Sequence, residues 1–301
     1  MKLSFTTLDV FTSTRYNGNP LAVISVSAPS EALLTQTKKQ KIAAEFNLSE
    51  IIFLHLASPS PASDESLTNE FTIDIFMPNA EIPFAGHPTV GAAYFLLHVL
   101  KLPAVALRVK AGRIPISLDP GTGDVKADVP QDFHVHRVRA ASELVEAEAP
   151  CVSIVKGMSF ILVSLPDLPA LAKARGNIAP EDGSKCLDEG WQEGFIGTMY
   201  FVAQGEDEFG RGVYRTRMYA DGFEDPGTGS ASCALGCWLA SQGGGEKGLH
   251  KFSFVQGLEM GRQNDISVEV LTTGDKGATR EINRVFLSGT CVEVMEGTLE
   301  V

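Results

Sequence analysis

A pattern of strand, glycine-rich turn and apolar helix occurs twice in this chain, and it limits the fold more than any other feature. In the first copy, the sequence GHPTVG at residues 86–91 lies between a strand and an alanine-rich helix over residues 89–99. In the second copy, PGTGSA at residues 226–231 leads from a strand into an Ala/Cys-rich helix over residues 232–241. Because element order, turn chemistry and helix composition agree, internal duplication explains the two copies better than chance.

A chain of 301 residues is long enough for two modest domains. We expect an α+β fold with an N-terminal domain at residues 1–129 and a C-terminal domain at residues 130–301, whose last strand can return to the first domain. Two such domains facing each other would place two helix N-termini and their polar loops around one cleft. A small anion held there would have its charge offset by both helix dipoles.

The composition limits the partners and the location. Hydrophobic residues make up 44% of the chain and charged residues 21%, as in ordinary globular proteins. The formal net charge of −12 argues against nucleic acid and anionic membranes as partners. We see no apolar run of a signal peptide or a membrane span. Five cysteines without a spaced framework predict free thiols, so we expect a cytoplasmic protein.

The turn at residues 86–91 has the properties of a ligand-binding helix start. Pro88 suits the first turn of a helix, and Gly86 lets the backbone approach another group. Helix N-termini present N–H groups to carboxylates. His87 at this point could bind a ligand or move a proton, and it could equally be a cap or a packing residue. The histidine alone leaves both readings open.

Two more candidates lie near the ends of predicted strands. We expect a helix that begins at a Ser30 cap and ends at Asn47, followed by a buried strand over residues 51–54. Glu50 enters that strand, where a carboxylate must be paired, protonated or used. Asn19 lies in the turn before a returning strand and is either a turn former or a ligand contact.

The acids Glu224 and Asp225 precede the second turn. N-capping is the common role of an acid there, but two adjacent acids before a glycine-rich helix start also fit a substrate site. The glycines do not match a P-loop or a dinucleotide-binding fingerprint. His134 and His136 share one face of a predicted strand, and no carboxylate or cysteine cluster lies beside them in the sequence. We therefore predict an exposed strand face there and no metal site.

Several short motifs occur together and in a fixed order along the chain. They are DVF at 9–11, GNP at 18–20, NLSE at 47–50, FAGHPT at 84–89, EDPGTGSA at 224–231, QG at 256–257 and GR at 261–262. In this combination the chain resembles the PhzF family of phenazine biosynthesis-like proteins, which are related in fold to diaminopimelate epimerase. The resemblance implies two similar domains, each a mostly antiparallel sheet wrapped around a central helix, with the active site in a cleft between them.

The resemblance also implies a proton shuttle that needs no cofactor. Glu50 would take a proton from carbon and return one elsewhere, while His87, Asp225 and Ser230 fall on other site positions of the family. A homodimer is a further family expectation. Together with the two helix starts, this predicts a substrate-binding set of Asn19, Ser49, Gly86, Thr228, Gly229 and Ser230.

The chain departs from the family pattern at four places. Gly227 replaces an alanine, which we expect only to loosen the turn, and Ile51 replaces a threonine after Glu50, which alters the local hydrogen bonding. The sequence pair at 263–264 replaces Pro-Ser. The loop at 57–69 looks long, as an insertion near the dimer surface or the cleft would.

The predicted function is that of a cofactor-independent isomerase. It would move a proton between carbons of a small carboxylate-bearing substrate, with Glu50 as general base and acid. Cys233 and Cys237 follow the second turn as small buried helix residues, which disfavours a two-thiol racemase. The alternatives are an epimerase or racemase without catalytic cysteines, and a binding or scaffold protein that keeps the fold. The complete set of site residues argues against the scaffold.

Overall fold

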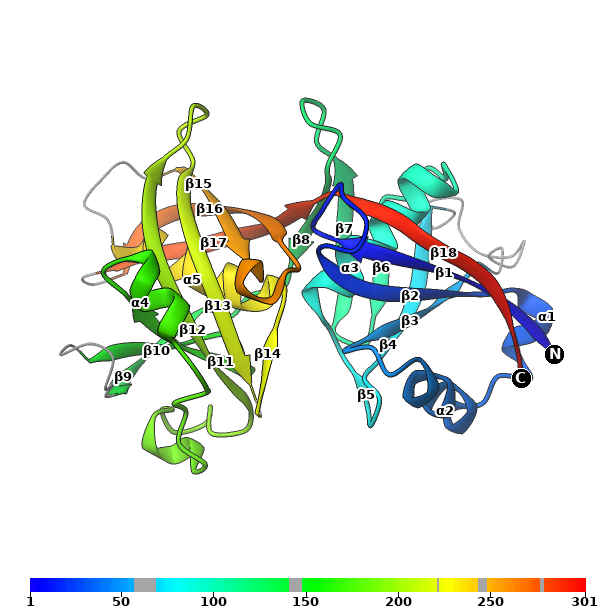
Figure 1. Ribbon diagram of the computed structural model, residues 1–301, viewed down its shortest axis with the longest axis horizontal. Coiled ribbons are helices and arrows are strands. Elements are labelled where there is room, and N and C mark those ends of the chain that lie inside the picture. The colour runs from blue at the N-terminus through cyan, green and yellow to red at the C-terminus, as the bar shows by residue number, and fades with distance from the viewer. Residues whose placement is uncertain (57–68, 141–147, 221, 243–247, 277–278) are drawn as a thin grey trace. The chain divides into compact units, whose positions relative to one another are not determined.

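A computed structural model of the chain divides into two compact units. Unit 1 consists of Met1–Asp128 and Ser288–Val301, and unit 2 of Val129–Leu287 (Figure 1). The structure describes the whole chain except residues 57–68, 141–147, 221, 243–247 and 277–278. Most of the predicted long loop at 57–69 therefore lies outside the described residues.

Unit 1 is a mixed sheet with few helices. Its strands are β1 (Lys2–Val10), β2 (Asn19–Val26), β3 (Ile51–His55), β4 (Glu70–Phe76), β5 (Glu81–Ile82), β6 (Ala106–Val109), β7 (Gly112–Leu118), β8 (Val125–Val129) and β18 (Cys291–Glu300). Its helices are α1 (Ala28–Glu31), α2 (Gln36–Phe46), α3 (Gly86–Tyr94) and the π-helix η2 (Phe95–Val99). The strands pair in the order β18-β1-β2-β3-β4-β6-β7. The short strand β5 lies antiparallel on β4, just before α3.

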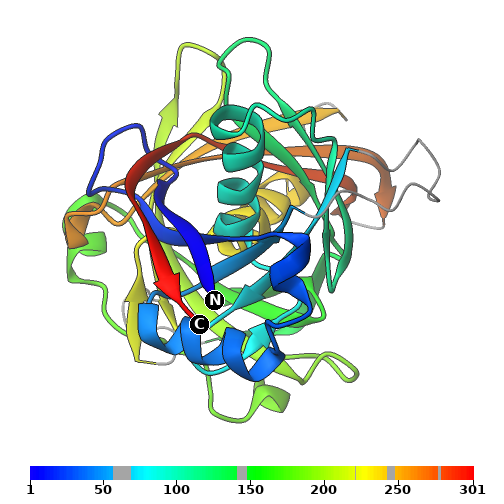
Figure 2. The same cartoon turned by 90° about the vertical axis from the view of Figure 1, so that its right-hand side faces the viewer.

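Helix α3 lies against the sheet of unit 1. It contacts β1, β2 and β3 (Figure 2). Its first eight residues are all buried. Small residues make this possible, because a Cβ on Gly91 would overlap Leu21 of β2. Strand β3 is buried on both faces, with Ile51 to Leu54 at most 1% exposed, as its unbroken apolar run predicts.

One local prediction in unit 1 is wrong. The stretch expected to form a single helix from a Ser30 cap forms two helices, and Ser30 lies inside α1, whose cap position is Ser27. Thr35 starts the second helix, because its side chain accepts a hydrogen bond from the Lys38 N–H. The predicted end is correct: Asn47 adopts a left-handed conformation directly after α2.

Unit 2 repeats the topology of unit 1. Its strands are β9 (His134–Ala140), β10 (Ala149–Val155), β11 (Gly157–Ser164), β12 (Gly194–Glu206), β13 (Gly212–Ala220), β14 (Phe223–Asp225), β15 (Leu249–Gln256), β16 (Asn264–Lys276) and β17 (Thr279–Gly289). Its helices are α4 (Leu168–Lys173), α5 (Gly229–Gln242) and the 3-10 helices η3 (Gly183–Lys185) and η4 (Leu258–Met260). The strands pair in the order β9-β10-β11-β12-β13-β15-β16.

The two orders have the same series of strand directions. In each unit it reads antiparallel, antiparallel, parallel, antiparallel, parallel, antiparallel. In unit 2, β14 lies antiparallel on β13 just before α5, as β5 lies on β4 before α3. Helix α5 packs against β10, β11, β15 and β16. In each unit, a short strand therefore leads directly into the start of one buried helix.

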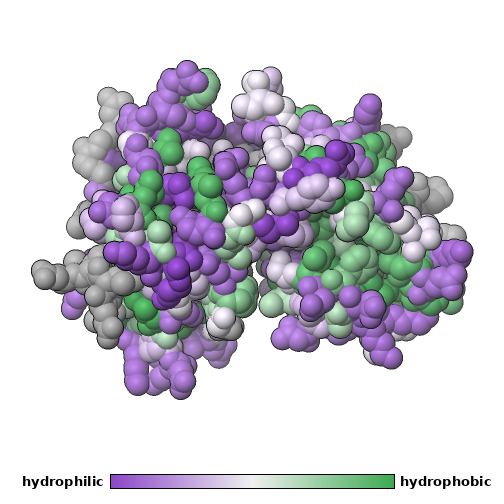
Figure 3. Space-filling view, viewed as in Figure 1, coloured by the Kyte–Doolittle hydropathy of each residue, from purple (hydrophilic) through white to green (hydrophobic). Residues whose placement is uncertain are grey.

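The surface is polar over most of the face shown in Figure 3, and hydrophobic residues gather on that face over β2 and β3 of unit 1. None of the helices in the described part of the chain has the length and apolarity required to cross a bilayer.

Candidate active site

Glu50 is held at the point where β3 begins. Its neighbour Ile51 pairs with Ala22 of β2 on one side and Phe76 of β4 on the other, so the backbone at Glu50 is fixed from both sides. The Glu50 side chain is 18% exposed. Burial raises the pKa of its carboxyl group above the usual 4.5, and a hydrogen bond with the Ser49 side chain opposes this increase more weakly. Glu50 is thus a carboxyl group whose proton is held more tightly than in water.

His87 lies beside this carboxyl group. It is the second residue of α3, which begins at Gly86 without a side-chain cap from Ala85. The buried imidazole has its Nδ1 at 3.8 Å from Glu50 Oε2 and at 3.5 Å from Asn19 Nδ2. An amide N–H of Asn19 donates to Nδ1 in the tautomer that carries its proton on Nε2.

The predicted residues of unit 1 therefore form one group. Asn19, Ser49, Glu50, Gly86 and His87 come from the start of β2, the start of β3 and the start of α3. Asn19 is 1% exposed, and its side chain contacts the histidine. His87 places a second titratable group beside Glu50.

Asp225 in unit 2 is part of a hydrogen-bond network within its turn. Its Oδ2 accepts a 2.6 Å hydrogen bond from Thr228 Oγ1, and its Oδ1 accepts the Gly227 N–H at 3.2 Å. Gln256 binds the same loop from β15: its Nε2 donates to the Asp225 carbonyl at 2.8 Å, and its Oε1 accepts the Thr228 N–H at 3.2 Å. Asp225 thus acts as a cap of the turn, as an acid commonly does before a helix.

The turn ends in the first residues of α5. Helix α5 begins at Gly229, and the Thr228 carbonyl accepts hydrogen bonds from the N–H and the hydroxyl of Ser232, both at 3.0 Å. Ser230 follows in the first turn and is half-buried. The structure thus brings Asp225, Thr228, Gly229 and Ser230 together at one helix N-terminus.

Gln256 and Asn264 are partners of this loop that the candidate set missed. Asn264 Nδ2 donates to the Pro226 carbonyl at 2.7 Å and to the Arg262 carbonyl at 2.8 Å. A Cβ built on Gly227 would overlap Asn264 Oδ1. The expectation that Gly227 only loosens the turn is therefore wrong, because the asparagine occupies the space that an alanine side chain would need. In the sequence, Gln256 could have been found because its QG motif occurs together with the turn motif at 224–231.

The prediction of an exposed strand face for the two histidines of β9 is also wrong. His136 is 3% exposed, and Asp188 lies beside it and His134, with ligand atoms of the three residues all within 4.8 Å of one another. His134 Nε2 is 2.9 Å from Asp188 Oδ2. His136 accepts the Asp188 N–H on Nδ1 at 3.0 Å and has Ser153 Oγ at 2.8 Å from Nε2. Both nitrogens of His136 are thus engaged in hydrogen bonds, which does not suit a metal ligand.

The cysteines after the second turn have the predicted structural character. Cys233 and Cys237 on α5 are buried, and burial raises the pKa of both thiols. A thiol that does not ionise is a poor nucleophile and a poor base.

The family model of phenazine biosynthesis-like proteins, PhzC-PhzF, matches residues 8–297. The chain belongs to this family. Among its relatives, the trans-2,3-dihydro-3-hydroxyanthranilate isomerase of Pseudomonas chlororaphis is 28% identical over 306 residues, which cover 97% of each chain. This relative confirms the expectation of an isomerase.

Solved structures of the family share the fold. A PhzF-family phenazine biosynthesis protein of Bacillus anthracis superposes with a TM-score of 0.73 at 21% identity, covering 100% of both chains. A predicted epimerase of Pseudomonas aeruginosa has a TM-score of 0.68 at 23% identity and covers 99% of both chains. At these identities the likeness shows the fold alone, and it confirms a PhzF-type and epimerase-like arrangement of mixed sheets with few helices.

Proposed function

We propose that the protein is a cofactor-independent isomerase that moves a proton between two carbons of a small carboxylate-bearing substrate. The observation that carries this proposal is the pair formed by Glu50 and His87. A half-buried carboxyl group with a raised pKa lies 3.8 Å from a buried imidazole. Such tuning brings a carboxyl group closer to the operating pH, where general bases work best.

In the proposed reaction Glu50 is first the base and then the acid. Its carboxylate takes a proton from a carbon next to an unsaturated or carbonyl system, and the electron pair of the broken C–H bond moves the double bond by one position. The protonated Glu50 then returns a proton to another carbon, so that no electrons leave or enter the substrate. His87 holds a polar group of the substrate and helps to move the proton, with Asn19 fixing its ring.

We assign substrate binding to the two helix starts. The N-terminal turns of α3 and α5 offer backbone dipoles that favour a carboxylate and developing negative charge. On this assignment Gly86 and Ser49 contribute from unit 1, and Thr228, Gly229 and Ser230 from unit 2. Asp225 holds a polar group of the substrate and assists the proton transfer.

The same proposal includes features expected from the family resemblance. The two units are taken as domains, each a sheet wrapped around its buried helix. A homodimer and a cytoplasmic location belong to the proposal as well, the latter supported by five free, buried cysteines.

The substrate named for the Pseudomonas chlororaphis relative, trans-2,3-dihydro-3-hydroxyanthranilate, is the first compound to test. We would incubate it with the protein in deuterium oxide and follow the products by proton NMR. The proposal predicts a product with a shifted double bond and deuterium at the carbon that receives the proton. Deuterium at the original carbon with inverted configuration and no shift of the double bond would instead show a thiol-free epimerase. If neither this compound nor any of a panel of small cyclic carboxylates is converted, both the isomerase and the epimerase hypotheses are contradicted.

A further inference from the structure

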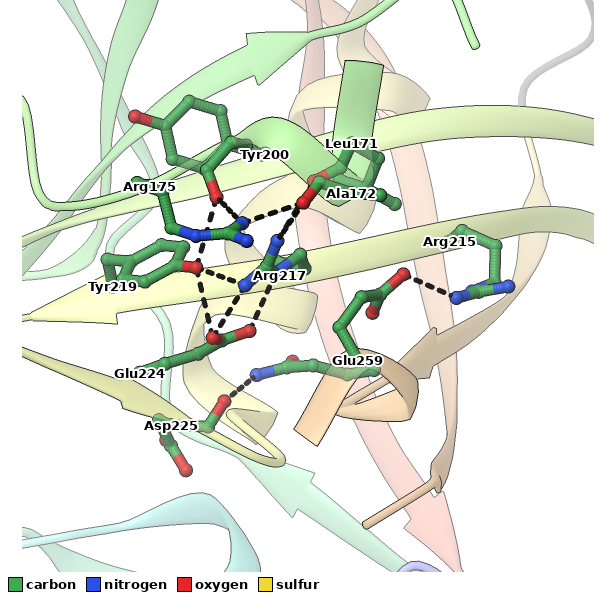
Figure 4. A network of polar contacts seen from close by, with 12 residues as sticks. Leu171, Ala172, Arg175, Tyr200, Arg215, Arg217, Tyr219, Glu224, Asp225 and Glu259 are labelled. Carbon is green, nitrogen blue, oxygen red and sulfur yellow. Dashed lines mark hydrogen bonds and ion pairs between the residues drawn. The ribbon is translucent and has the colours of Figure 1, made fainter. Parts of the chain in front are cut away.

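A buried arginine anchors the short strand that carries Asp225. Arg217 of β13 is 4% exposed and binds the carboxylate of Glu224 with two hydrogen bonds, Nε to Oε1 and Nη2 to Oε2, both 2.7 Å long (Figure 4). Its third nitrogen, Nη1, donates to the carbonyls of Leu171 and Ala172 in α4, each at 3.1 Å. A two-point contact of this kind fixes orientation as well as distance.

Tyr219 completes the cluster around Glu224. Its hydroxyl lies 3.0 Å from Glu224 Oε2 and 3.1 Å from the Ala174 carbonyl, and it also accepts a hydrogen bond from Arg217 Nη2. Burial raises the pKa of Tyr219 to about 12, so the hydroxyl remains a donor at neutral pH. The hydrogen bond and charge of Glu224 raise the pKa of Arg217. Arg217 therefore stays charged and Tyr219 stays neutral over the range in which an enzyme works.

Strand β14 is held by a short stretch of backbone pairing and by its side chains. It is three residues long, and its pairing with β13 consists of Met218 with Asp225, Tyr219 with Glu224 and Ala220 with Phe223. Phe223 is 50% exposed at the outer end. Glu224 thus ties β14 to Arg217 in the body of unit 2, next to the contacts that Asp225 makes with Thr228 and Gln256.

We propose that Arg217 is a positioning residue, which sets the place and angle of the Asp225 loop through its two-point contact with Glu224. The inference rests on the role proposed above for Asp225. A buried ion pair is a weak means of stabilising a fold, because an apolar pair of similar volume is often as stable. What an apolar pair cannot supply is the fixed angle between β13 and β14, and a substrate group misplaced by about 1 Å costs up to about a hundredfold in rate.

The neighbouring pair of Arg215 and Glu259 provides a matched control. Arg215 lies two residues earlier on β13, and one of its nitrogens, Nη2, contacts Glu259 Oε1 at 2.7 Å (Figure 4). Both side chains are 20% exposed, and Glu259 belongs to η4 rather than to the Asp225 strand. Removing this pair also takes one arginine from β13 and one glutamate from a partner element, but it leaves β14 unchanged.

The experiment compares Arg217→Met/Glu224→Gln with Arg215→Met/Glu259→Gln. We expect the first double variant to keep its thermal midpoint within a few degrees of the wild type, because it leaves no buried charge unpaired. Its KM for trans-2,3-dihydro-3-hydroxyanthranilate should rise about tenfold, whereas a partly unfolded preparation would lower kcat and leave KM unchanged. Arg217→Lys should show the same rise, since an ammonium group cannot make the two-point contact. The control pair should stay within about twofold of the wild type.

Hydrogen exchange of residues 223–230, followed by mass spectrometry, adds a readout that needs no substrate. We expect faster exchange in both Arg217 variants and no change in the control. Wild-type exchange of this segment in Arg217→Lys, or a wild-type KM in the double variant, would overturn the inference. Glu50→Gln measured alongside separates the two proposals: if it is inactive while the Arg217 variants behave as wild type, the positioning role fails and the proposed function stands. If Glu50→Gln is fully active, the proposed function fails.

Discussion

The starts of helices α3 and α5 occupy equivalent places in two units of the same topology, yet their polar residues are arranged differently. At α3, His87 Nδ1 lies 3.5 Å from Asn19 and 3.8 Å from Glu50, distances long enough for the groups to rearrange around a substrate. At α5, Asp225 and Gln256 make short contacts with the turn that leave little freedom. The two helix starts thus differ in how tightly their polar side chains are held.

Replacing His87 sharpens this comparison most. We expect His87→Gln to lower kcat about a hundredfold, the lower end of the range for a positioned acid–base residue, because the amide can hold a polar group but cannot carry a proton. His98→Gln is the control, since this histidine lies on the π-helix that follows α3 and contacts the Gly123 carbonyl. Steady-state kinetics of both variants measure the effect. A wild-type kcat for His87→Gln would mean that the α3 start is not the catalytic one.

The rigidity of the α5 start can be tested through the contact between Gly227 and Asn264. We expect Gly227→Ala to cost about 1–3 kcal/mol in the free energy of unfolding, because the new methyl group overlaps Asn264 Oδ1. In the background of Asn264→Ser the same change should cost less, with a coupling of about 1 kcal/mol or more. Urea unfolding of the wild type, the two single variants and the double variant gives the four free energies of this double-mutant cycle.

In unit 1, Gly91→Ala inside α3 serves for comparison. There the overlap is with the end of the Leu21 side chain, which can adopt another rotamer, so the cost should be smaller than at Gly227. Additive costs in the Gly227 cycle, or a larger cost at Gly91, would contradict the contrast between the two helix starts.

The smallest effect we predict concerns the stability of unit 1 as a function of pH. Because burial raises the pKa of Glu50, the folded protein binds this proton more tightly than the unfolded chain does, and the resulting stability is lost as the pH rises through the folded-state pKa. Glu50→Gln should therefore be more stable than the wild type at pH 8, by about 1.4 kcal/mol for each pKa unit, and equally stable below pH 4.5.

Glu70 supplies a control of opposite sign. Its hydrogen bond with Arg113 lowers its pKa, so Glu70→Gln should be less stable than the wild type at neutral pH and approach it as the pH falls through the lowered pKa. Thermal unfolding of both variants between pH 4 and 8 makes the comparison. If Glu50→Gln were less stable than the wild type at pH 8, the ionised Glu50 carboxylate would stabilise the folded protein instead of destabilising it.

The sequence alone indicated Glu50 and His87 as candidates, but it did not indicate their surroundings. Glu50 follows the end of a helix and His87 lies at the start of one, and local turn residues predict both of these boundaries. Asn264 and Arg217 gave no such signal, because their roles depend on contacts with residues that a strand register brings close. Asp188 escaped prediction for the same reason: it lies far along the chain from His134 and His136, in a stretch without strand or helix periodicity.

The two short helices α1 and α2 show the same limit at smaller scale. Ser30 and Thr35 are both good cap residues, and local preference does not decide between one helix and two. Packing decided it, because Leu34, which lies between the two helices, is buried in a cluster with Ala43 and Phe53.

The rate of solvent deuterium incorporation by Glu50→Gln tests the central claim most directly. The control is Glu45→Gln, an exposed glutamate of α2 that lies five residues earlier and carries the same change of charge. With trans-2,3-dihydro-3-hydroxyanthranilate in deuterium oxide, we expect the wild type and Glu45→Gln to incorporate deuterium at equal rates. Glu50→Gln, with an unchanged circular dichroism spectrum, should be slower by a factor of about 10²–10⁴. Incorporation by Glu50→Gln at the wild-type rate would show that another group carries the proton.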